Sequence, residues 1–138
     1  MAPPPRSPPD RRAILRVALI RFAILLGVLV FGAVAWWMRD GSGATPPPNP
    51  DFFVRLGIFP ALVVGASLAA VVALRVMWGR TTDPARRRTL AIVAMAPAEA
   101  AALFGAVGYF LAGDSRWFLM GMFVLAATVV LFPLRDLR

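Results

Sequence analysis

Glu99 is the residue whose position most clearly calls for a chemical explanation. It is the only glutamate in the chain and the only charged residue in the apolar run 90–113. An ionised carboxylate is costly in hydrocarbon, so such a group is protonated, hydrogen-bonded or paired with a cation. Glu99 is therefore either a structural carboxyl that orders neighbouring helices or a membrane-embedded proton or cation site. The run contains no second acid, which favours the structural role.

Three residues are candidate partners of Glu99 because they are expected at a similar depth. Glu99 lies nine residues into the run that begins at residue 90, which is about 13 Å at 1.5 Å per residue. Arg21 lies eight residues into a helix that begins at residue 13, so the two side chains could form an ion pair. Ser67 and Thr128 are expected near the middle of their own helices, where a hydroxyl could hydrogen-bond the carboxyl.

The chain has neither cysteine nor histidine. This composition excludes disulfides, thiol chemistry, histidine-based acid–base catalysis, His-ligated haem and the commonest zinc sites. Asp40, Asp51 and Asp114 lie beside glycine, proline or serine, as is typical of turns, and do not form an acid pair within an apolar run. We therefore predict a non-enzymatic protein with no catalytic residue, no metal site and no cofactor.

Four long apolar segments supply the elements that would hold these residues. The chain has 138 residues, of which 59% are hydrophobic, and its mean hydropathy is +0.73. About 20 apolar residues suffice to cross a hydrocarbon core of ~30 Å. We predict an all-α integral membrane bundle of four transmembrane helices, at about 13–38, 53–78, 89–112 and 117–134. They form one membrane domain, 13–138, after a disordered Pro/Arg-rich cytoplasmic tail, 1–12, which could also be a proline-rich ligand.

The distribution of arginine, the only basic residue type, predicts the orientation in the membrane. The chain carries 15 basic residues and a net charge of +8. Most arginines flank the two termini or lie within 75–88, whereas Arg39, Arg55 and Arg116 flank the other helix ends. The positive-inside rule therefore places both termini and the loop 80–88 in the cytoplasm. We predict a multi-pass protein of the bacterial inner (plasma) membrane, and no nucleic-acid partner, because the arginines flank apolar runs instead of forming one basic face.

The start of the chain has a second interpretation. Residues 11–38 also resemble a secretory signal, with a small-residue cleavage site in "AVA" at 33–35. The uncharged run 22–38 is longer than most signal cores, and Trp36 and Trp37 follow the "AVA" at once. These features favour an uncleaved anchor.

Proline and small residues predict how the helices bend and meet. Pro60 and Pro97 are expected to bend the second and third helices. Small residues allow helices to approach closely in lipid. Two rows of them are the expected helix contacts: in the third helix Ala91, Ala94, Ala98, Ala101, Gly105, Gly108 and Ala112, and in the second helix Ala61, Gly65, Ala69 and Ala73. At 100° per residue, Glu99 lies roughly 130° from the first row, so it faces a different helix, a subunit contact or lipid.

The stretch from Glu99 to Asp114 carries a resemblance to known proteins. It reads Glu-Ala-Ala-Ala-Leu-Phe and then Tyr-Phe-Leu-Ala-Gly-Asp. This is similar to a set of small four-helix bacterial membrane proteins of unassigned function, whose third helix reads Glu-x-x-x-Leu-Phe before an aromatic-Leu-x-Gly-Asp/Asn turn. Many of those proteins have glycine after the glutamate, where this chain has Ala100. The resemblance implies a four-helix membrane fold and no particular activity.

A looser local resemblance links Glu99-Ala100 and Phe104-Gly105 to the carboxylate helix of the rotary ATPase proteolipid. In the proteolipid the carboxylate lies on the second helix of a hairpin, whereas here it is predicted on the first. Small multidrug transporters also have four helices and one membrane glutamate, but theirs lies on the first helix.

Two functions follow from these observations. The first is a non-enzymatic accessory or interaction subunit, whose partners are the lipid bilayer and either a second copy of the chain or another membrane subunit. The alternative is a proton-coupled carrier or channel in which Glu99 is the proton site. No small-molecule substrate is identifiable from the sequence.

Overall fold

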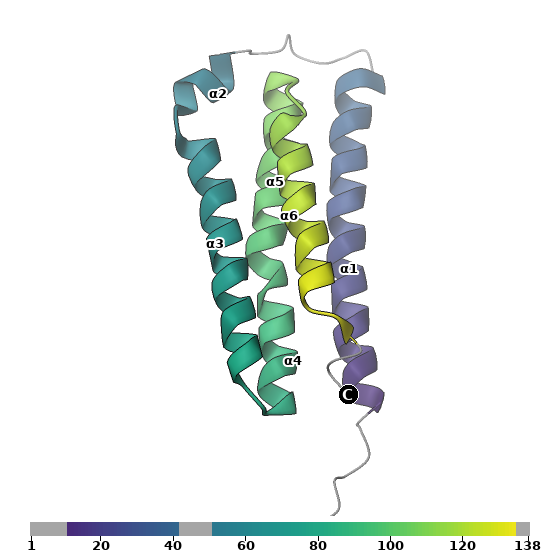
Figure 1. Cartoon of the computed structure of the whole chain (residues 1–138). Helices are drawn as coiled ribbons and strands as arrows, with labels where there is room; N and C mark the ends of the chain where they lie inside the picture. Colours follow the sequence, from purple (N-terminus) through teal and green to yellow (C-terminus); the bar gives the residue numbers. More distant parts are fainter. Residues whose placement is uncertain (1–10, 42–50, 135–138) are drawn as a thin grey trace, which may run out of the picture.

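The chain folds into helices that lie side by side (Figure 1). The computed structural model describes residues 11–41 and 51–134, and every element in these two ranges is helical, which confirms the predicted all-α class at this level. The elements are α1 (Arg11–Trp36), the π-helical turn η1 (Trp37–Gly41), α2 (Asp51–Leu56), α3 (Phe59–Arg80), α4 (Pro84–Val93), α5 (Met95–Ala112) and α6 (Arg116–Leu131). Because α2 leads into α3 and α4 leads into α5, the elements form four rods.

Three of these rods are long and apolar enough to cross a membrane. They are residues 12–41, Phe59–Arg80 and Pro84–Ala112, while α6 is a shorter apolar helix of 16 residues. Large apolar side chains such as Leu19, Phe22 and Leu62 are exposed on α1 and α3, as expected of surfaces that face lipid. The length and composition of the helices thus agree with the predicted membrane class.

Prolines determine where two of the rods are interrupted. The helix α2 ends at Leu56 and α4 ends at Val93, in each case four residues before a proline, Pro60 or Pro97. Proline has no N–H to donate to the carbonyl four residues earlier, and its ring clashes with that carbonyl. The predicted continuous helix 53–78 is therefore broken, and Gly57 takes a left-handed conformation (φ 57°) at the break.

The remaining boundaries differ modestly from those predicted. The first helix begins at Arg11, so the last two residues of the predicted tail 1–12 are helical, and residues 1–10 lie outside the described part. The third rod begins at Pro84 instead of 89, because the side chain of Asp83 caps it by accepting a 2.9 Å hydrogen bond from the Ala85 N–H. The helix α6 ends at Leu131, since the residue before Pro133 is forced out of the helical conformation.

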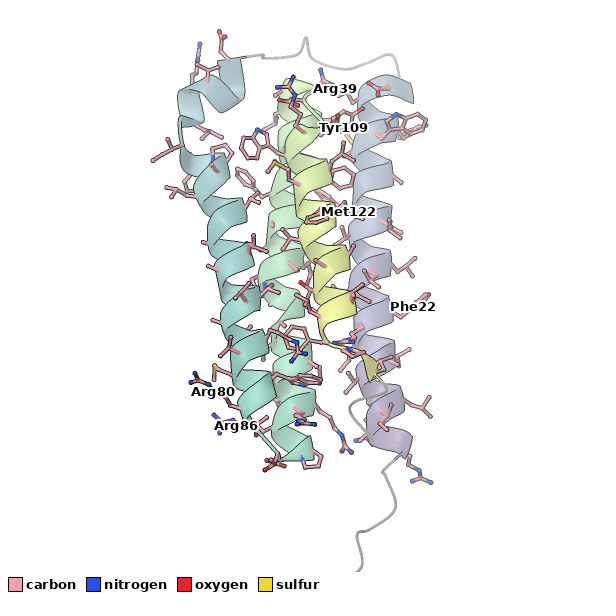
Figure 2. All side chains as sticks on the ribbon, in the orientation of Figure 1. Phe22, Arg39, Arg80, Arg86, Tyr109 and Met122 are labelled. Carbon is pink, nitrogen blue, oxygen red and sulfur yellow. The ribbon has the colours of Figure 1, made fainter. Side chains whose placement is uncertain are left out.

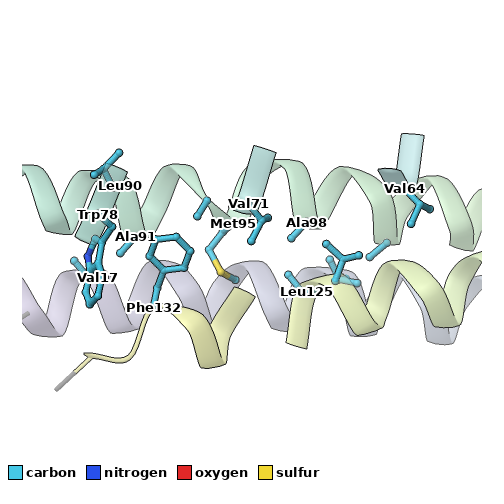
Figure 3. Packing of buried hydrophobic residues seen from close by; sticks show 14 residues of the cluster. Val17, Val64, Val71, Trp78, Leu90, Ala91, Met95, Ala98, Leu125 and Phe132 are labelled. Atoms are coloured by element: carbon cyan, nitrogen blue, oxygen red, sulfur yellow. The ribbon is translucent and has the colours of Figure 1, made fainter. Parts of the chain in front are cut away.

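The helix α5 is the centre of the bundle and contacts α1, α3 and α6. Its contact with α6 is the closest, because glycines let the two backbones approach. A Cβ atom added at Gly105 would lie 2.5 Å from the Phe118 Cα, and one added at Gly121 would lie 2.6 Å from the Ala102 Cα. Figure 3 shows the buried core between these helices, with Met95 and Ala98 of the third rod facing Leu125 of α6.

Candidate functional site

Arg21 joins α1 to the ends of two other helices. Its side chain is only 4% exposed. The Nη1 group donates a 2.5 Å hydrogen bond to the Phe132 carbonyl, and Nη2 donates a 3.3 Å bond to the Ala91 carbonyl. Phe132 is the C-terminal cap of α6, and Ala91 lies in the last turn of α4. The guanidinium therefore connects three helices through two carbonyl groups.

The chemistry of helix ends explains why an arginine is found there. The last carbonyls of a helix lack partners within it and carry the negative end of its dipole. Burying such carbonyls without donors is unfavourable, and a planar guanidinium can serve two of them at once. Prolines place both helix ends beside Arg21, because Pro97 ends α4 at Val93 and Pro133 ends α6 at Leu131.

The proposed ion pair between Arg21 and Glu99 is not formed. Within the described residues Glu99 makes no hydrogen bond or salt bridge, and its side chain is half-buried on α5. The reason is that Arg21 is engaged by the two carbonyl groups. The predicted ion pair is wrong because equal depth in the membrane does not account for backbone carbonyls, which here accept the hydrogen bonds of Arg21.

The two hydroxyl candidates do not reach Glu99 either. Thr128 is buried in α6 and donates a 2.8 Å hydrogen bond to the Val124 carbonyl of its own helix. Ser67 is buried on α3, and no bond joins it to Glu99 in the described part of the chain. Glu99 therefore stands apart from all three candidates of the sequence analysis.

The two rows of small residues have opposite environments. The seven small residues of the third rod are all buried, from Ala91 in α4 to Ala112 in α5. In contrast, Ala61, Gly65, Ala69 and Ala73 of α3 are all exposed. A Cβ atom added at Gly65 would meet nothing within 4 Å. The prediction that this second row forms a helix contact is therefore wrong for the single chain.

The helix α3 buries a face other than its row of small residues. The helix α3 turns a different face inward, formed by Pro60, Val64, Ser67, Val71 and Trp78. These larger residues follow steps of three, four and seven, which keeps them on one side of the helix. The helix α3 contacts α5, and the residues that it buries are these larger ones, so its row of small residues is not used in that contact.

A second polar contact joins η1 to the C-terminal end of α5 (Figure 2). The Tyr109 hydroxyl donates a 2.5 Å hydrogen bond to Asp40, and Arg39 Nη1 donates a 2.5 Å bond to the Phe110 carbonyl. Gly113, which caps α5 with φ 76°, leaves space for the guanidinium, since a Cβ there would lie 2.6 Å from Arg39 Nη2. This contact was not predicted, because Arg39 was interpreted only as a charge flanking a helix end and Asp40 only as a turn residue.

The other end of the bundle carries a cluster of arginines around one tryptophan. Trp78 is 4% exposed, and its ring centroid lies 4.4 Å from Arg75 Cζ and 5.2 Å from Arg87 Cζ. The Phe132 ring meets the indole edge-on, with centroids 5.8 Å apart. Figure 3 shows Trp78 beside Phe132 and Val17. In the sequence analysis these arginines served only to predict the orientation in the membrane. The spacing of three residues between Arg75 and Trp78, which places both on one helix face, was the available signal.

Comparisons with family models, curated proteins and solved structures find no match to this chain. The resemblance to small four-helix bacterial membrane proteins therefore stays a prediction. Among residues 11–41 and 51–134 there is no group of three or more Asp or Glu side chains that could hold a metal ion. The polar groups that these ranges do bring together include arginines, carbonyls, aspartates, one tyrosine and a tryptophan. This chemistry suits helix fixation and anion binding.

Proposed function

We propose that this chain is a four-span protein of the bacterial inner membrane that acts as a non-enzymatic interaction subunit. In this proposal α6 is the fourth span, and both termini and the loop between α3 and α4 lie in the cytoplasm. The position of Arg75, Arg80 and Arg86 at one end of the rods supports this orientation through the positive-inside rule. The 16 residues of α6 reach about 24 Å at 1.5 Å per residue, which a locally thinned bilayer can accommodate.

The observation that carries the interaction role is the exposed small-residue face of α3. Ala61, Gly65, Ala69 and Ala73 recur every four residues, and the fold of the single chain leaves them uncovered. Of the membrane-length window of α3, 22% is buried, compared with 50% for the α4–α5 rod. In lipid, a row of this kind lets a second helix approach closely enough for extensive van der Waals contact. The surface therefore fits a transmembrane helix of a second copy or of another subunit.

Replacing Gly65 by leucine tests this role. A bulky side chain would hold a docked helix away, and overpacking of about 1–3 kcal/mol corresponds to roughly 5- to 150-fold weaker association. Energy transfer between two labelled copies in vesicles measures self-association, and co-purification with the subunit cross-linked to the parent chain measures hetero-association. Gly27→Leu is the matched control, because Gly27 lies on α1 and also has nothing within 4 Å of an added Cβ. Equal association of the parent and both variants in both assays would refute the interaction role of α3.

Reporter fusions test the topology separately. A reporter after Arg138 and one in the loop between α3 and α4 should both give cytoplasmic signals, whereas one between η1 and α2 should give an external signal. A C-terminal reporter outside the cytoplasm would contradict a fourth span.

A proton-coupled carrier or channel is the second candidate, and one observation favours it. Glu99 is half-buried in the middle of the α4–α5 rod and forms no hydrogen bond or ion pair with the described residues. A carboxyl in this position is available to bind and release a proton. We expect Glu99 to react with a hydrophobic carbodiimide near neutral pH. We also expect Glu99→Gln to lose a pH-driven flux while its fold stays intact. A chain that is not labelled, and a stable Glu99→Gln variant with unchanged flux, would eliminate this role.

A further inference from the structure

The arginines at the Trp78 end of the bundle form no ion pair with an acid among residues 11–41 and 51–134. Residues 75–88 contain Arg75, Arg80, Arg86, Arg87 and Arg88 and a single acid, Asp83. Asp83 caps α4 through the Ala85 N–H. The salt bridge found within 11–41 and 51–134 joins Arg116 to Asp114 elsewhere in the chain. Two guanidinium groups, those of Arg75 and Arg87, nevertheless lie within 4.4 and 5.2 Å of the same indole ring. Such neighbouring charges favour an anion between or beside them.

Two buried donors at this end have no acceptor in the described part of the chain. Trp78 Nε1 and Arg88 Nε are buried and have no hydrogen-bond partner in the described part of the chain. Trp78 is 4% exposed, so bulk water does not reach most of its surface. Both groups can only donate, so each of them can bond only to an acceptor. In contrast, Arg87 Nε is engaged by the Thr81 carbonyl at 2.8 Å, which holds this side chain against the tryptophan.

We propose that Arg75 and Arg87, which both lie against the Trp78 ring, form a binding site for the phosphate group of an anionic phospholipid. A phosphate supplies negative charge and several acceptor oxygens, which are the two properties that this cluster lacks. The cluster lies where the membrane-length helix α3 ends and α4 begins, the depth of a headgroup for a rod that spans the bilayer. Val76 and Met77, next along α3, are 48% and 44% exposed and offer an apolar surface to an acyl chain. A phospholipid can contact both the arginines and this apolar surface, whereas free phosphate can contact only the arginines.

The exposed arginines of the same end provide matched controls. Arg80 and Arg86 lie at this end of α3 and α4 (Figure 2), and both side chains are exposed. If lipid were attracted only by general positive charge, removing these arginines would weaken binding as much as removing Arg75 and Arg87. If the cluster around Trp78 is a defined site, only the removal of Arg75 and Arg87 should weaken lipid binding.

Lipid titration of the purified full chain, followed by native mass spectrometry, tests the proposal with phosphatidylglycerol as the probe and phosphatidylcholine as the reference. We expect phosphatidylglycerol to bind at least about tenfold more tightly than phosphatidylcholine. Arg75→Gln with Arg87→Gln should weaken phosphatidylglycerol binding by roughly 25-fold, since each basic residue near an anionic lipid contributes about fivefold. Arg80→Gln with Arg86→Gln should weaken it less than about threefold, because exposed charges contribute little in salt. Equal losses in both pairs, or equal binding of the two lipids, would overturn the proposal.

Two further measurements separate the lipid from free phosphate and from misfolding. Glycerol phosphate should not displace phosphatidylglycerol at equal concentration, and displacement by it would overturn the assignment to a lipid. In the parent chain, brominated phosphatidylglycerol should quench tryptophan fluorescence. This quenching component should disappear in Trp78→Phe and remain in Trp36→Phe. Quenching that is unchanged in Trp78→Phe would refute the site even if the arginine variants failed to fold.

Discussion

Replacing Arg21 by methionine should destabilise the bundle much more than its position in an apolar helix suggests. Methionine fills a similar length and removes the charge, but it leaves the carbonyls of Phe132 and Ala91 buried without donors. Leaving a buried polar group unsatisfied costs about 1–3 kcal/mol, so two such groups cost about 2–6 kcal/mol. Because the folded state no longer has to desolvate a cation, part of this cost is recovered. We expect a net loss of about 2–4 kcal/mol in the free energy of unfolding, estimated from these two terms.

Reversible unfolding in mixed micelles, followed by circular dichroism, measures this loss. The matched control is Arg16→Met, because Arg16 lies on the same helix with an exposed side chain and should change the free energy by less than about 0.5 kcal/mol. Arg21→Lys should fall between the two, since an ammonium group lacks the planar fork that serves two separate carbonyls. If Arg21→Met and Arg16→Met unfold alike, the hydrogen bonds of Arg21 do not stabilise the fold.

A double-mutant cycle distinguishes this contact from an ion pair with Glu99. If Arg21 acts on the two carbonyls, the effects of Arg21→Met and Glu99→Gln should add within about 0.5 kcal/mol. If the two side chains are paired, the double variant should be restored toward the parent, because neither charge would be left alone. Coupling above about 1 kcal/mol would refute our assignment of the Arg21 partners.

Two further predictions concern the packing of α5. Gly105→Leu should lower the free energy of unfolding by about 1–3 kcal/mol or more, because a Cβ there meets the backbone of α6 at 2.5 Å. Gly65→Leu should leave the stability of the single chain unaffected. Equal melting temperatures of the two variants would contradict the close α5–α6 contact. Tyr109→Phe removes the hydrogen bond to Asp40 and should lower the free energy of unfolding by less than about 1 kcal/mol, since the bond is exposed. Amide hydrogen exchange should become faster at η1 and stay unchanged near Arg21. Unchanged exchange at η1 would contradict the contact.

The helical class and the breaks in the rods could be predicted because they depend on local chemistry. Long apolar runs predict helices in a membrane, and Pro60 and Pro97 act on the carbonyl four residues before them. A bend was predicted at each proline, but the last helical residue before it was not, because the spacing of four residues was not applied. With that spacing, Leu56 and Val93 follow as the last residues of α2 and α4.

The helix contacts were harder to predict because contact depends on two surfaces. The rows of small residues in α3 and α5 look equivalent in the sequence, yet one is exposed and the other buried. Small residues permit close approach but do not select the partner. Part of the α5 row packs against α6, where Gly105 meets the Phe118 backbone, whereas α3 buries Val64 and Val71 instead of its own small residues.

The partner of Arg21 was missed because backbone carbonyls carry no signature of their own in a sequence. Carbonyls without a partner in their own helix are found where a helix ends, and Pro97 and Pro133 determine both ends near Arg21. The same reasoning applies at the other end of the bundle, where Arg39 donates to Phe110 at the end of α5. Both arginines belong to the α1–η1 segment, which has no row of small residues comparable to that of α5. Because apolar packing in lipid does not strongly specify how far one helix slides along another, hydrogen bonds at two separate levels are what fix the register of this rod against the rest of the bundle.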